Sequence, residues 1–492
     1  MRKRGTLFEV ARRTLAYGIG DAFARGTNLI LLPVYAALLS PEEYGTLSIA
    51  LVLGAMLNML LAFGMNGAAL KFYYGFEGPE RKSFYGAIWV FLLAVPACLL
   101  LLVELSGGFP LRQMLLHVPY SPHIRLTLWT AYATVAFVTI PREVFRASGR
   151  SGAYLLLNAA GFLSIVGLTA LLVAKLRLGA EGALQARLYA SIVLALIAVS
   201  IVWRVASLRG MRVRFVRTAL GYGVPLIPHY LAHWSLGLVD RVILERFVPL
   251  AQVGIYSAGY QIGAAMLLAS GAINNALIPL FGRANRSDEG ALRMLARVIT
   301  YYVLAVSTLA LVLSTFAREF VMILTPDAYQ QAVQVVPLVV LGYLFLALYY
   351  PSMNVLTLMA GKTRFVGAMT GFAAGGNVAL NLWLIPRIGI QGAAVSTAIA
   401  FACLFLLVSV ASNCTLRLPL EYKRIGLVLF AVLASYVAGF LVAQRAPAHS
   451  LWIRSASLCL YPVILLVGGF LTDVEKRFLA RVLGGRCARR TK

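Results

Sequence analysis

The segments Gly179-Ala-Glu-Gly-Ala183 and Gly389-Ile-Gln-Gly-Ala393 are two copies of one turn. Matching residues flank the two turns in the same order, at separations of 205 to 212 positions: Leu15, Tyr17 and Gly18 with Leu220, Tyr222 and Gly223, Gly45 with Gly254, Phe109 and Tyr120 with Phe316 and Tyr329, and Gly149-Arg150 with Gly361-Lys362. An ordered set of this kind indicates that the chain contains an internal duplication.

Apolar runs of about twenty residues lie between these landmarks, and each is long enough to span roughly 30 Å of hydrocarbon as a helix. Apolar residues make up 60% of the 492 residues, charged residues 13%, and the mean hydropathy is +0.82. Lipid cannot hydrogen-bond an open backbone, so the runs must be helical. We expect about fourteen membrane helices, which start near residues 14, 44, 83, 124, 153, 183, 217, 253, 298, 333, 365, 390, 424 and 451.

The expected fold class is an all-α integral membrane protein in which two pseudo-symmetric six-helix bundles surround a central cavity and two C-terminal helices follow. An even number of helices in each repeat gives both copies the same orientation in the membrane. The predicted organisation is a basic cytoplasmic N-terminus (1–13), an N-terminal lobe (14–210), a C-terminal lobe (211–415), two additional helices (416–472) and a basic cytoplasmic tail (473–492).

The net charge of +26 is explained by where the 44 basic residues lie along the chain. Most of them fall in alternate loops, in the first thirteen residues and in the segment after Leu471. This pattern follows the positive-inside rule and places both termini in the cytoplasm, so it calls for no nucleic-acid partner. The five cysteines have no paired or metal-like spacing.

The first expected helix carries Gly18, Asp21, Arg25 and Asn28 along one face. Arg25 lies about eleven residues into the span, roughly 16 Å at 1.5 Å per residue, and therefore near the bilayer centre. An arginine there costs roughly 2.5 to 3.5 kcal/mol unless it faces protein, water or a ligand, and an anionic phosphate is such a ligand. The alternative is an i,i+4 salt bridge with Asp21.

The equivalent helix of the second repeat has Tyr222, Pro225, His229, His233 and Asp240 on one face. The prolines at positions 225 and 228 should bend it, since each removes a backbone hydrogen bond. The two histidines can titrate, contact substrate or pack, but no acidic or cysteine neighbour completes a metal site. Asp240 and its neighbour at position 241 are expected in a wet neighbourhood at the outer end of the helix, either as functional candidates or as no more than a solvated pair.

Four polar residues are expected at the cytoplasmic mouth of the cavity, namely Asn66 and Lys71 after the second helix and Arg142 and Arg146 near the end of the fourth. Such a ring would attract anions. The positive-inside rule alone also predicts basic residues at these positions. We found no nucleophile elbow, phosphate-binding loop, metal-binding His-Glu helix or acidic metal pair, so we predict neither an enzyme nor a cofactor.

Several runs resemble bacterial oligosaccharide and polysaccharide flippases. They are Leu39-Ser-Pro-Glu-Glu-Tyr-Gly45, Gly64-Met-Asn-Gly-Ala-Ala-Leu-Lys-Phe-Tyr-Tyr74, Tyr222-Gly-Val-Pro225, Asp240-Arg-Val-Ile-Leu244, Val253-Gly-Ile-Tyr-Ser257 and Ile385-Pro386 through Gly392-Ala-Ala394. The resemblance covers about residues 10 to 415. It implies the multidrug, oligosaccharidyl-lipid and polysaccharide exporter superfamily, whose members have two six-helix lobes around a V-shaped cavity.

The resemblance also implies residue roles. Polyprenyl-diphosphate-linked glycan is the usual cargo of this branch, and Arg25 and Lys71 are expected nearest its diphosphate. Asp21, Asp240 and the two histidines are the candidates for ion coupling. Peptidoglycan-precursor flippases of the superfamily have two extra terminal helices beside a groove for the lipid tail, and the last two helices here are expected to form a similar groove.

The functional prediction is a flippase that moves polyprenyl-diphosphate-linked oligosaccharide across the bacterial inner membrane by alternating access, for surface polysaccharide such as O-antigen, lipopolysaccharide or exopolysaccharide. The alternatives are a multidrug or cation antiporter and a peptidoglycan-precursor lipid flippase. The expected partners are the lipid-linked glycan, membrane lipid, and the glycan polymerase and glycosyltransferases of the pathway. We expect a monomer driven by an ion gradient or the membrane potential, because no nucleotide-binding loop is present.

Overall fold

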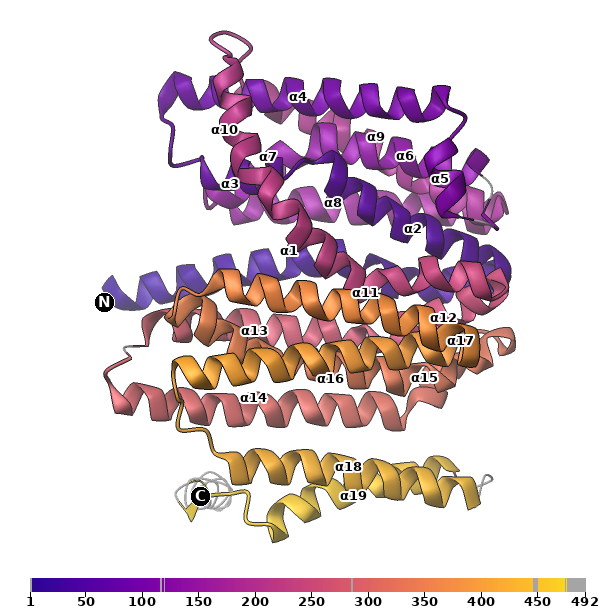
Figure 1. The fold of residues 1–492 in the computed structure, drawn as a ribbon, viewed down its shortest axis with the longest axis vertical. Coiled ribbons are helices and arrows are strands. Elements are labelled where there is room, and N and C mark those ends of the chain that lie inside the picture. The colour runs from indigo at the N-terminus through magenta and orange to yellow at the C-terminus, as the bar shows by residue number, and fades with distance from the viewer. Residues whose placement is uncertain are drawn as a thin grey trace, which may run out of the picture.

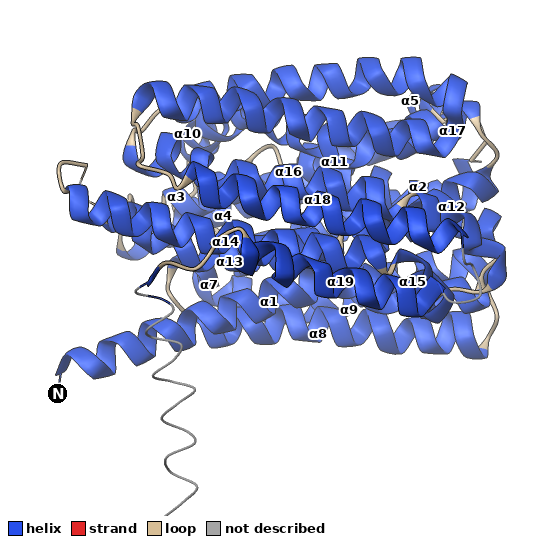
Figure 2. Ribbon diagram, turned by 90° about the horizontal axis from the view of Figure 1, so that it is seen from below, coloured by secondary structure: helices blue, strands red, loops and turns tan. Residues whose placement is uncertain are grey.

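The computed structural model describes residues 2–115, 117–118, 120–284, 286–445, 450–473 and 475 of the chain. Helices account for nearly all of these residues, and the described part contains no strand (Figure 2). A chain in lipid must pair its backbone N–H and C=O groups internally, and helices do so within each segment.

The helices form two successive sets, which we call the first and second lobes, followed by two further helices (Figure 1). The first lobe comprises α1 (Arg2–Leu38), α2 (Pro41–Leu61), α3 (Met65–Lys71), α4 (Gly78–Leu105), α5 (Phe109–Met114), η1 (Tyr120–Ile124), α6 (Arg125–Ala133), η2 (Thr134–Val138), α7 (Thr139–Ala147), α8 (Ser151–Thr169), η3 (Ala170–Lys175) and α9 (Gly179–Val205).

The second lobe comprises α10 (Val213–Gly223), η4 (Val224–Leu226), α11 (Ile227–Phe247), α12 (Leu250–Gly263), α13 (Ala265–Arg283), α14 (Glu289–Thr315), α15 (Ala317–Leu324), η5 (Asp327–Gln334), α16 (Val336–Asn354), η6 (Val355–Met359) and α17 (Thr363–Thr415). The helices α18 (Tyr422–Arg445) and α19 (Ser450–Val467) complete the chain and lie at the edge of the bundle beside the second lobe (Figure 1).

The all-α membrane fold expected from the sequence is confirmed. Among the described residues, ten helical segments are long and apolar enough to cross a membrane, and Leu451–Val467 is a shorter apolar helix. The longest segment, α17, counts once but contains two of the expected helices, because Ile388 and Gly389 leave the helical conformation in its middle. Each expected helix start lies close to the start of a described helix or to this kink, with two exceptions. The first lies inside the longer α1, and the one near residue 298 lies well inside α14 (Glu289–Thr315).

The duplication is visible in the backbone as well as in the sequence. Gly179 and Gly389 both have positive φ, +61° and +57°, at equivalent kinks of the two lobes. Gly149 and Gly361 show the same agreement, with φ of +70° and +66°. Glycine enters this left-handed region without the steric cost that a side chain brings, so the chain turns at the same points in both copies.

The two lobes meet at the beginnings of α2 and α12. Ser40 caps α2, since its Oγ accepts a hydrogen bond from the Glu43 backbone N–H at 3.2 Å and its own N–H donates to the Glu43 carboxylate at 2.9 Å. In the next turn, Gly45 approaches α12 so closely that a Cβ would overlap the carbonyl oxygen of Leu250, and a Cβ on Gly254 would overlap that of Pro41.

Ser48 and Ser257 extend this contact with an Oγ–Oγ hydrogen bond of 2.6 Å. Gly45 and Gly254 are equivalent residues of the two repeats, as are these two serines, so a pseudo-two-fold axis passes between α2 and α12. We call this region the α2–α12 contact. It lies at the distal end of the bundle, opposite the end at which α1 begins (Figure 1).

The substitution Gly254→Ala tests the α2–α12 contact. The added methyl group must push α12 away from α2, and overpacking of this kind costs about 1 to 3 kcal/mol in the free energy of unfolding. Thermal unfolding of the purified protein should therefore begin at a lower temperature.

The matched control is Gly271→Ala on α13, where a Cβ would meet no atom within 4 Å. Alanine is the better helix former by about 1 kcal/mol, so this variant should unfold at the same or a higher temperature. Equal melting temperatures for the two variants would contradict the close approach of α2 and α12.

Candidate functional site

A cavity of about 920 Å³ lies between the two lobes. Its walls come from α2, α3, η2 and α7 of the first lobe and from α11, α16, η6 and α17 of the second. We call it the central cavity. Asn66, Arg142, His229 and His233, which the sequence predicts as site residues, all line it.

The first-lobe wall of the central cavity holds polar atoms without partners. The Asn58 amide nitrogen donates to the Gly54 carbonyl at 2.8 Å, but its Oδ1 has no hydrogen-bond partner within the described structure. The same holds for Asn66 Oδ1 and for Arg142 Nε, and all three atoms are buried. Buried polar groups are normally hydrogen-bonded, so this wall is suited to a polar ligand or to ordered water.

Glu143 is an acidic residue of this wall that the sequence analysis did not select. It is 8% exposed, and a guanidinium nitrogen of Arg146 lies 3.8 Å from its carboxylate. Arg146 itself is exposed and is not among the residues that line the central cavity. An ionisable residue within a membrane span is the signal that would have identified Glu143.

The second-lobe wall is positioned by the break between α10 and α11. The expected bend occurs at the 3-10 segment η4, which contains Pro225, and α11 restarts with Pro228 in its first turn. The restarted helix turns His229, His233 and Trp234 toward the cavity. In the described residues, no group of three potential ligands lies close enough to hold a metal ion.

Lys71 lies at the end of α3, outside the lining of the central cavity. Its Nζ is 4.0 Å from the ring centroid of Tyr222 on α10 and 5.2 Å from that of Phe72. A cation over an aromatic face is attracted by the ring quadrupole. Lys71 therefore links the two lobes at the end opposite the α2–α12 contact.

The α1 residues predicted for the site are only partly described. The Asp21 carboxylate accepts a hydrogen bond from the Tyr154 hydroxyl at 2.6 Å, and this residue does not belong to the described cavity lining. Arg25 is part of α1, but its side chain falls outside the described residues. Its role stays a prediction.

The expectation that Asp240 and Arg241 form a solvated pair is wrong, because the two residues are only 1% and 4% exposed. The Asp240 carboxylate accepts from Arg241 Nη1 at 2.9 Å and from the Tyr256 hydroxyl. The Arg241 guanidinium also lies 3.9 Å from the ring centroid of Tyr260. Residues of α12 therefore cover the pair.

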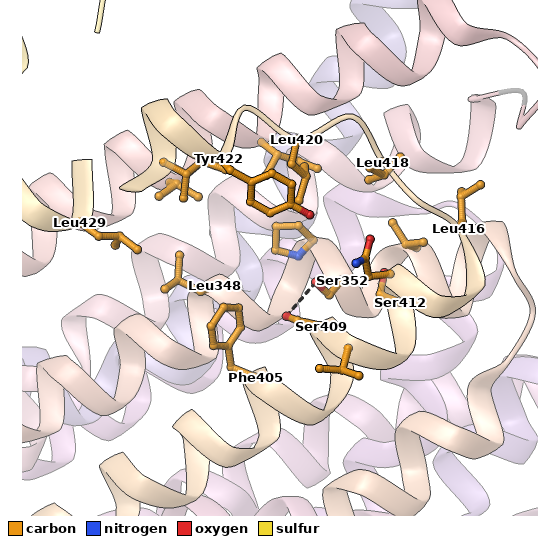
Figure 3. Close-up of a pocket in the computed structure, with 17 residues that line it drawn as sticks. Leu348, Ser352, Phe405, Ser409, Ser412, Leu416, Leu418, Leu420, Tyr422 and Leu429 are labelled. Carbon is orange, nitrogen blue, oxygen red and sulfur yellow. Dashed lines mark hydrogen bonds between the residues drawn. The ribbon is translucent and has the colours of Figure 1, made fainter. Parts of the chain in front are cut away.

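A second, mostly apolar cavity of about 360 Å³ lies between α18 and the second lobe (Figure 3). Leucine side chains from the 416–420 loop and from α18 surround it, together with Phe405 and Tyr422. The few polar groups include Ser352 and Ser409, whose hydroxyl oxygens are 3.1 Å apart. We call it the lateral groove.

Comparisons with known proteins agree with this architecture. The family model described as "Polysaccharide biosynthesis protein" matches residues 10–285. The Lsg locus putative protein 1 of Haemophilus influenzae is 29% identical over 94 residues, 19% of this chain and 23% of that protein. An uncharacterized membrane protein of Methanocaldococcus jannaschii is 22% identical over 197 residues, 39% of this chain and 38% of that protein. The alignments thus span well under half of these relatives.

Two solved structures show the same fold along most of the chain. The lipid II flippase MurJ in an inward closed conformation superposes with a TM-score of 0.74 at 12% identity, over 96% of this chain and 99% of that one. An inward-facing multidrug resistance MATE family transporter of the MOP superfamily superposes with a TM-score of 0.64 at 13% identity, over 79% of this chain and 94% of that one.

The fold is therefore that of a multi-pass membrane protein and is shared with these two solved structures. Within that class, the chain belongs to the polysaccharide biosynthesis protein family, whose model matches more than half of its length. The family resemblance recognised in the sequence is confirmed.

The substitution Asp240→Asn should destabilise the protein strongly. It removes the charge that compensates the buried Arg241, and breaking a buried ion pair from one side costs about 3 to 5 kcal/mol. Thermal unfolding in detergent measures the effect.

The control Glu289→Gln removes the acid from the exposed Arg293–Glu289 pair, whose atoms are 2.8 Å apart. Exposed i,i+4 pairs contribute little, so this variant should unfold like the wild-type protein. Equal stability of the two variants would show that water reaches Asp240.

Proposed function

We propose that this protein is a flippase that carries polyprenyl-diphosphate-linked oligosaccharide across the bacterial inner membrane by alternating access, for surface polysaccharide biosynthesis. The observation that carries the proposal is the central cavity between two duplicated lobes in a chain of the polysaccharide biosynthesis protein family. The buried groups without partners on Asn58, Asn66 and Arg142 support it, because a glycosyl diphosphate offers both hydrogen-bond donors and anionic acceptors.

The physical task separates the cargo into two parts. The sugar diphosphate cannot cross hydrocarbon unaided, whereas the polyprenyl chain is stable there. We assign the headgroup to the central cavity, with Arg142, Asn66, His229 and His233 around it. We assign part of the polyprenyl chain to the lateral groove, whose apolar lining matches it and which lies beside the two additional helices, as the family resemblance implies.

The duplicated lobes supply the movement. With the N-terminus in the cytoplasm, as the positive-inside rule predicts, the α2–α12 contact seals the periplasmic side of the cavity. Arg142 and His229 then lie in its cytoplasmic half. Rocking of the lobes about the pseudo-two-fold axis would separate α2 from α12. The opposite side would stay closed, since the backbones of Gly64 and Gly223 are already in close contact there.

The remaining predicted residues have supporting roles in this proposal. Arg25 is the α1 residue assigned to binding of the diphosphate, and Lys71 and Arg146 attract anions at the cytoplasmic mouth. Asp21 is the stronger candidate for ion coupling, since both carboxylate oxygens of Asp240 already have partners. The same proposal includes the predicted division of the chain into lobes 14–210 and 211–415, additional helices 416–472 and basic termini 1–13 and 473–492. It also includes a monomeric state and the enzymes of the pathway as partners.

An antiporter for cationic drugs is less well supported by the central cavity. Such a protein needs a net acidic binding site, whereas Glu143 is the sole acid among the described lining residues and Arg142 lies beside it. Catalysis is not part of the proposal.

The substitution Arg142→Gln should abolish or strongly reduce transport while the protein still inserts in the membrane. A hydrogen bond to a charged group contributes about 1.5 to 3 kcal/mol, which corresponds to roughly 10- to 100-fold in affinity for the diphosphate. In a strain that depends on this gene, surface glycan should fall and the lipid-linked precursor should accumulate on the cytoplasmic side.

The control variant Arg293→Gln removes an exposed arginine far from the cavity lining and should leave export unchanged. Normal surface glycan in the Arg142→Gln strain, at equal protein level, would remove Arg142 from the transport mechanism. Normal surface glycan in a strain that lacks the gene would contradict the proposed flippase function.

A further inference from the structure

A third cavity lies inside the first lobe, between α1, α2, α6, α8 and α9, and has a volume of about 400 Å³. It shares Ala55, Asn58, Thr134 and Arg142 with the lining of the central cavity, so the two spaces adjoin. We call it the first-lobe pocket. The proposed transport path runs through the central cavity and does not require this pocket.

Arg187 is the charged residue that distinguishes this pocket. It lies eight residues after the start of α9, roughly 12 Å along the helix, and therefore at membrane depth. Its Nη2 donates to Asn28 Oδ1 at 2.7 Å, and its Nε is buried without a hydrogen-bond partner in the described structure. An arginine inside a membrane span is costly unless it serves a ligand or a pair.

No acidic residue compensates the pocket. The described lining contains Arg142 and Arg187 and neither aspartate nor glutamate. Glu143, the neighbour of Arg142 in the chain, lines the central cavity and lies against Arg146. Within the described part of the chain, neither Arg142 nor Arg187 has a carboxylate within 4.0 Å, so neither of the two guanidinium groups that line this space is in a direct ion pair.

The polar neighbours leave these guanidinium groups as the free donors. The hydroxyls of Thr27, Thr127 and Thr130 donate to carbonyl oxygens of their own helices at 2.6 to 3.0 Å. The amides of Asn58 and Asn158 donate to the backbone in the same way. A cation would meet repulsion in such a pocket, whereas an oxyanion would find two charged donors.

We propose that the first-lobe pocket is an oxyanion site, in which Arg187 and Arg142 bind a phosphate or carboxylate group and Asn28 positions Arg187. The origin of the anion rests on the proposed function: it is a group of the lipid-linked glycan, either its diphosphate or an acidic sugar. The binding of an anion in this pocket does not depend on the proposed function. Because Arg142 lines both spaces, an anion held there lies between the central cavity and the first lobe.

The test titrates the purified full-length protein with inorganic pyrophosphate at constant ionic strength and follows thermal unfolding. A ligand that binds only the folded state raises the melting temperature with its concentration. The wild-type protein should show this rise, and Arg187→Gln should need at least tenfold more pyrophosphate for the same shift. Arg293→Gln, on the exposed surface, should behave like wild type.

Asn28→Asp is the decisive variant, because it keeps the shape of the side chain and places a carboxylate beside Arg187. This internal anion should occupy the pocket, raise the melting temperature without ligand and abolish the pyrophosphate shift. Asn28 and Arg187 are not in the lining of the central cavity, so a loss in both variants locates the binding in the first-lobe pocket. An undiminished shift in Asn28→Asp would overturn the proposal.

Two further ligands identify the source of the anion. A shift with polyprenyl diphosphate or pyrophosphate supports binding of the carrier's phosphates, and a shift with glucuronate alone supports binding of an acidic sugar. No shift with any of the three overturns the site. Glycan export is measured separately in the gene-dependent strain, so failure of the transport function and failure of the pocket give different results.

Discussion

The hydrocarbon interior of a membrane provides neither hydrogen-bond partners nor counter-ions, and this constraint explains most of the structure. It forces the backbone into helices, and it directs the few polar side chains of the spans toward one another or toward the cavities. Asp240 and Arg241 show the first outcome, because each satisfies the other within a shell of tyrosines. Arg142 and Arg187 show the second, because both residues line the first-lobe pocket.

Close approach of the two lobes depends on residues without large side chains. The hydrophobic effect does not drive helices together in lipid, so association relies on packing and hydrogen bonds. Gly45 and Gly254 allow the backbones of α2 and α12 to touch, and the Ser48–Ser257 hydrogen bond adds a polar contact one turn further along. Both pairs are repeat-equivalent, so one contact surface meets a copy of itself.

The sequence predicted the features that depend on local pattern. Apolar length gave the helices, the glycine landmarks gave the duplication, and Pro225 gave the break between α10 and α11. Four of the predicted site residues line one cavity for a similar reason. Their spacing determines which face of a helix each residue occupies, and the helices run along the membrane normal.

Features that depend on contacts between distant helices were not predicted. Tyr256 on α12 covers Asp240, and the sequence pattern of α11 does not indicate where Tyr256 lies. Arg187 was not selected from the sequence, because it lies only about two turns from the start of α9. Its bond to Asn28 joins residues 159 positions apart, a relation that no local pattern reveals.

Within the described residues, the last two helices bond to and pack against the second lobe. The Thr308 hydroxyl on α14 lies 3.0 Å from that of Tyr461 on α19, and Arg454 bonds Glu319 on α15 at 3.0 Å. The lateral groove is likewise lined by α14, α16, η6, α17, the 416–420 loop and α18 (Figure 3). A hydrocarbon chain bound there would keep the same neighbouring residues while the angle between the lobes changes, and it would move together with the second lobe.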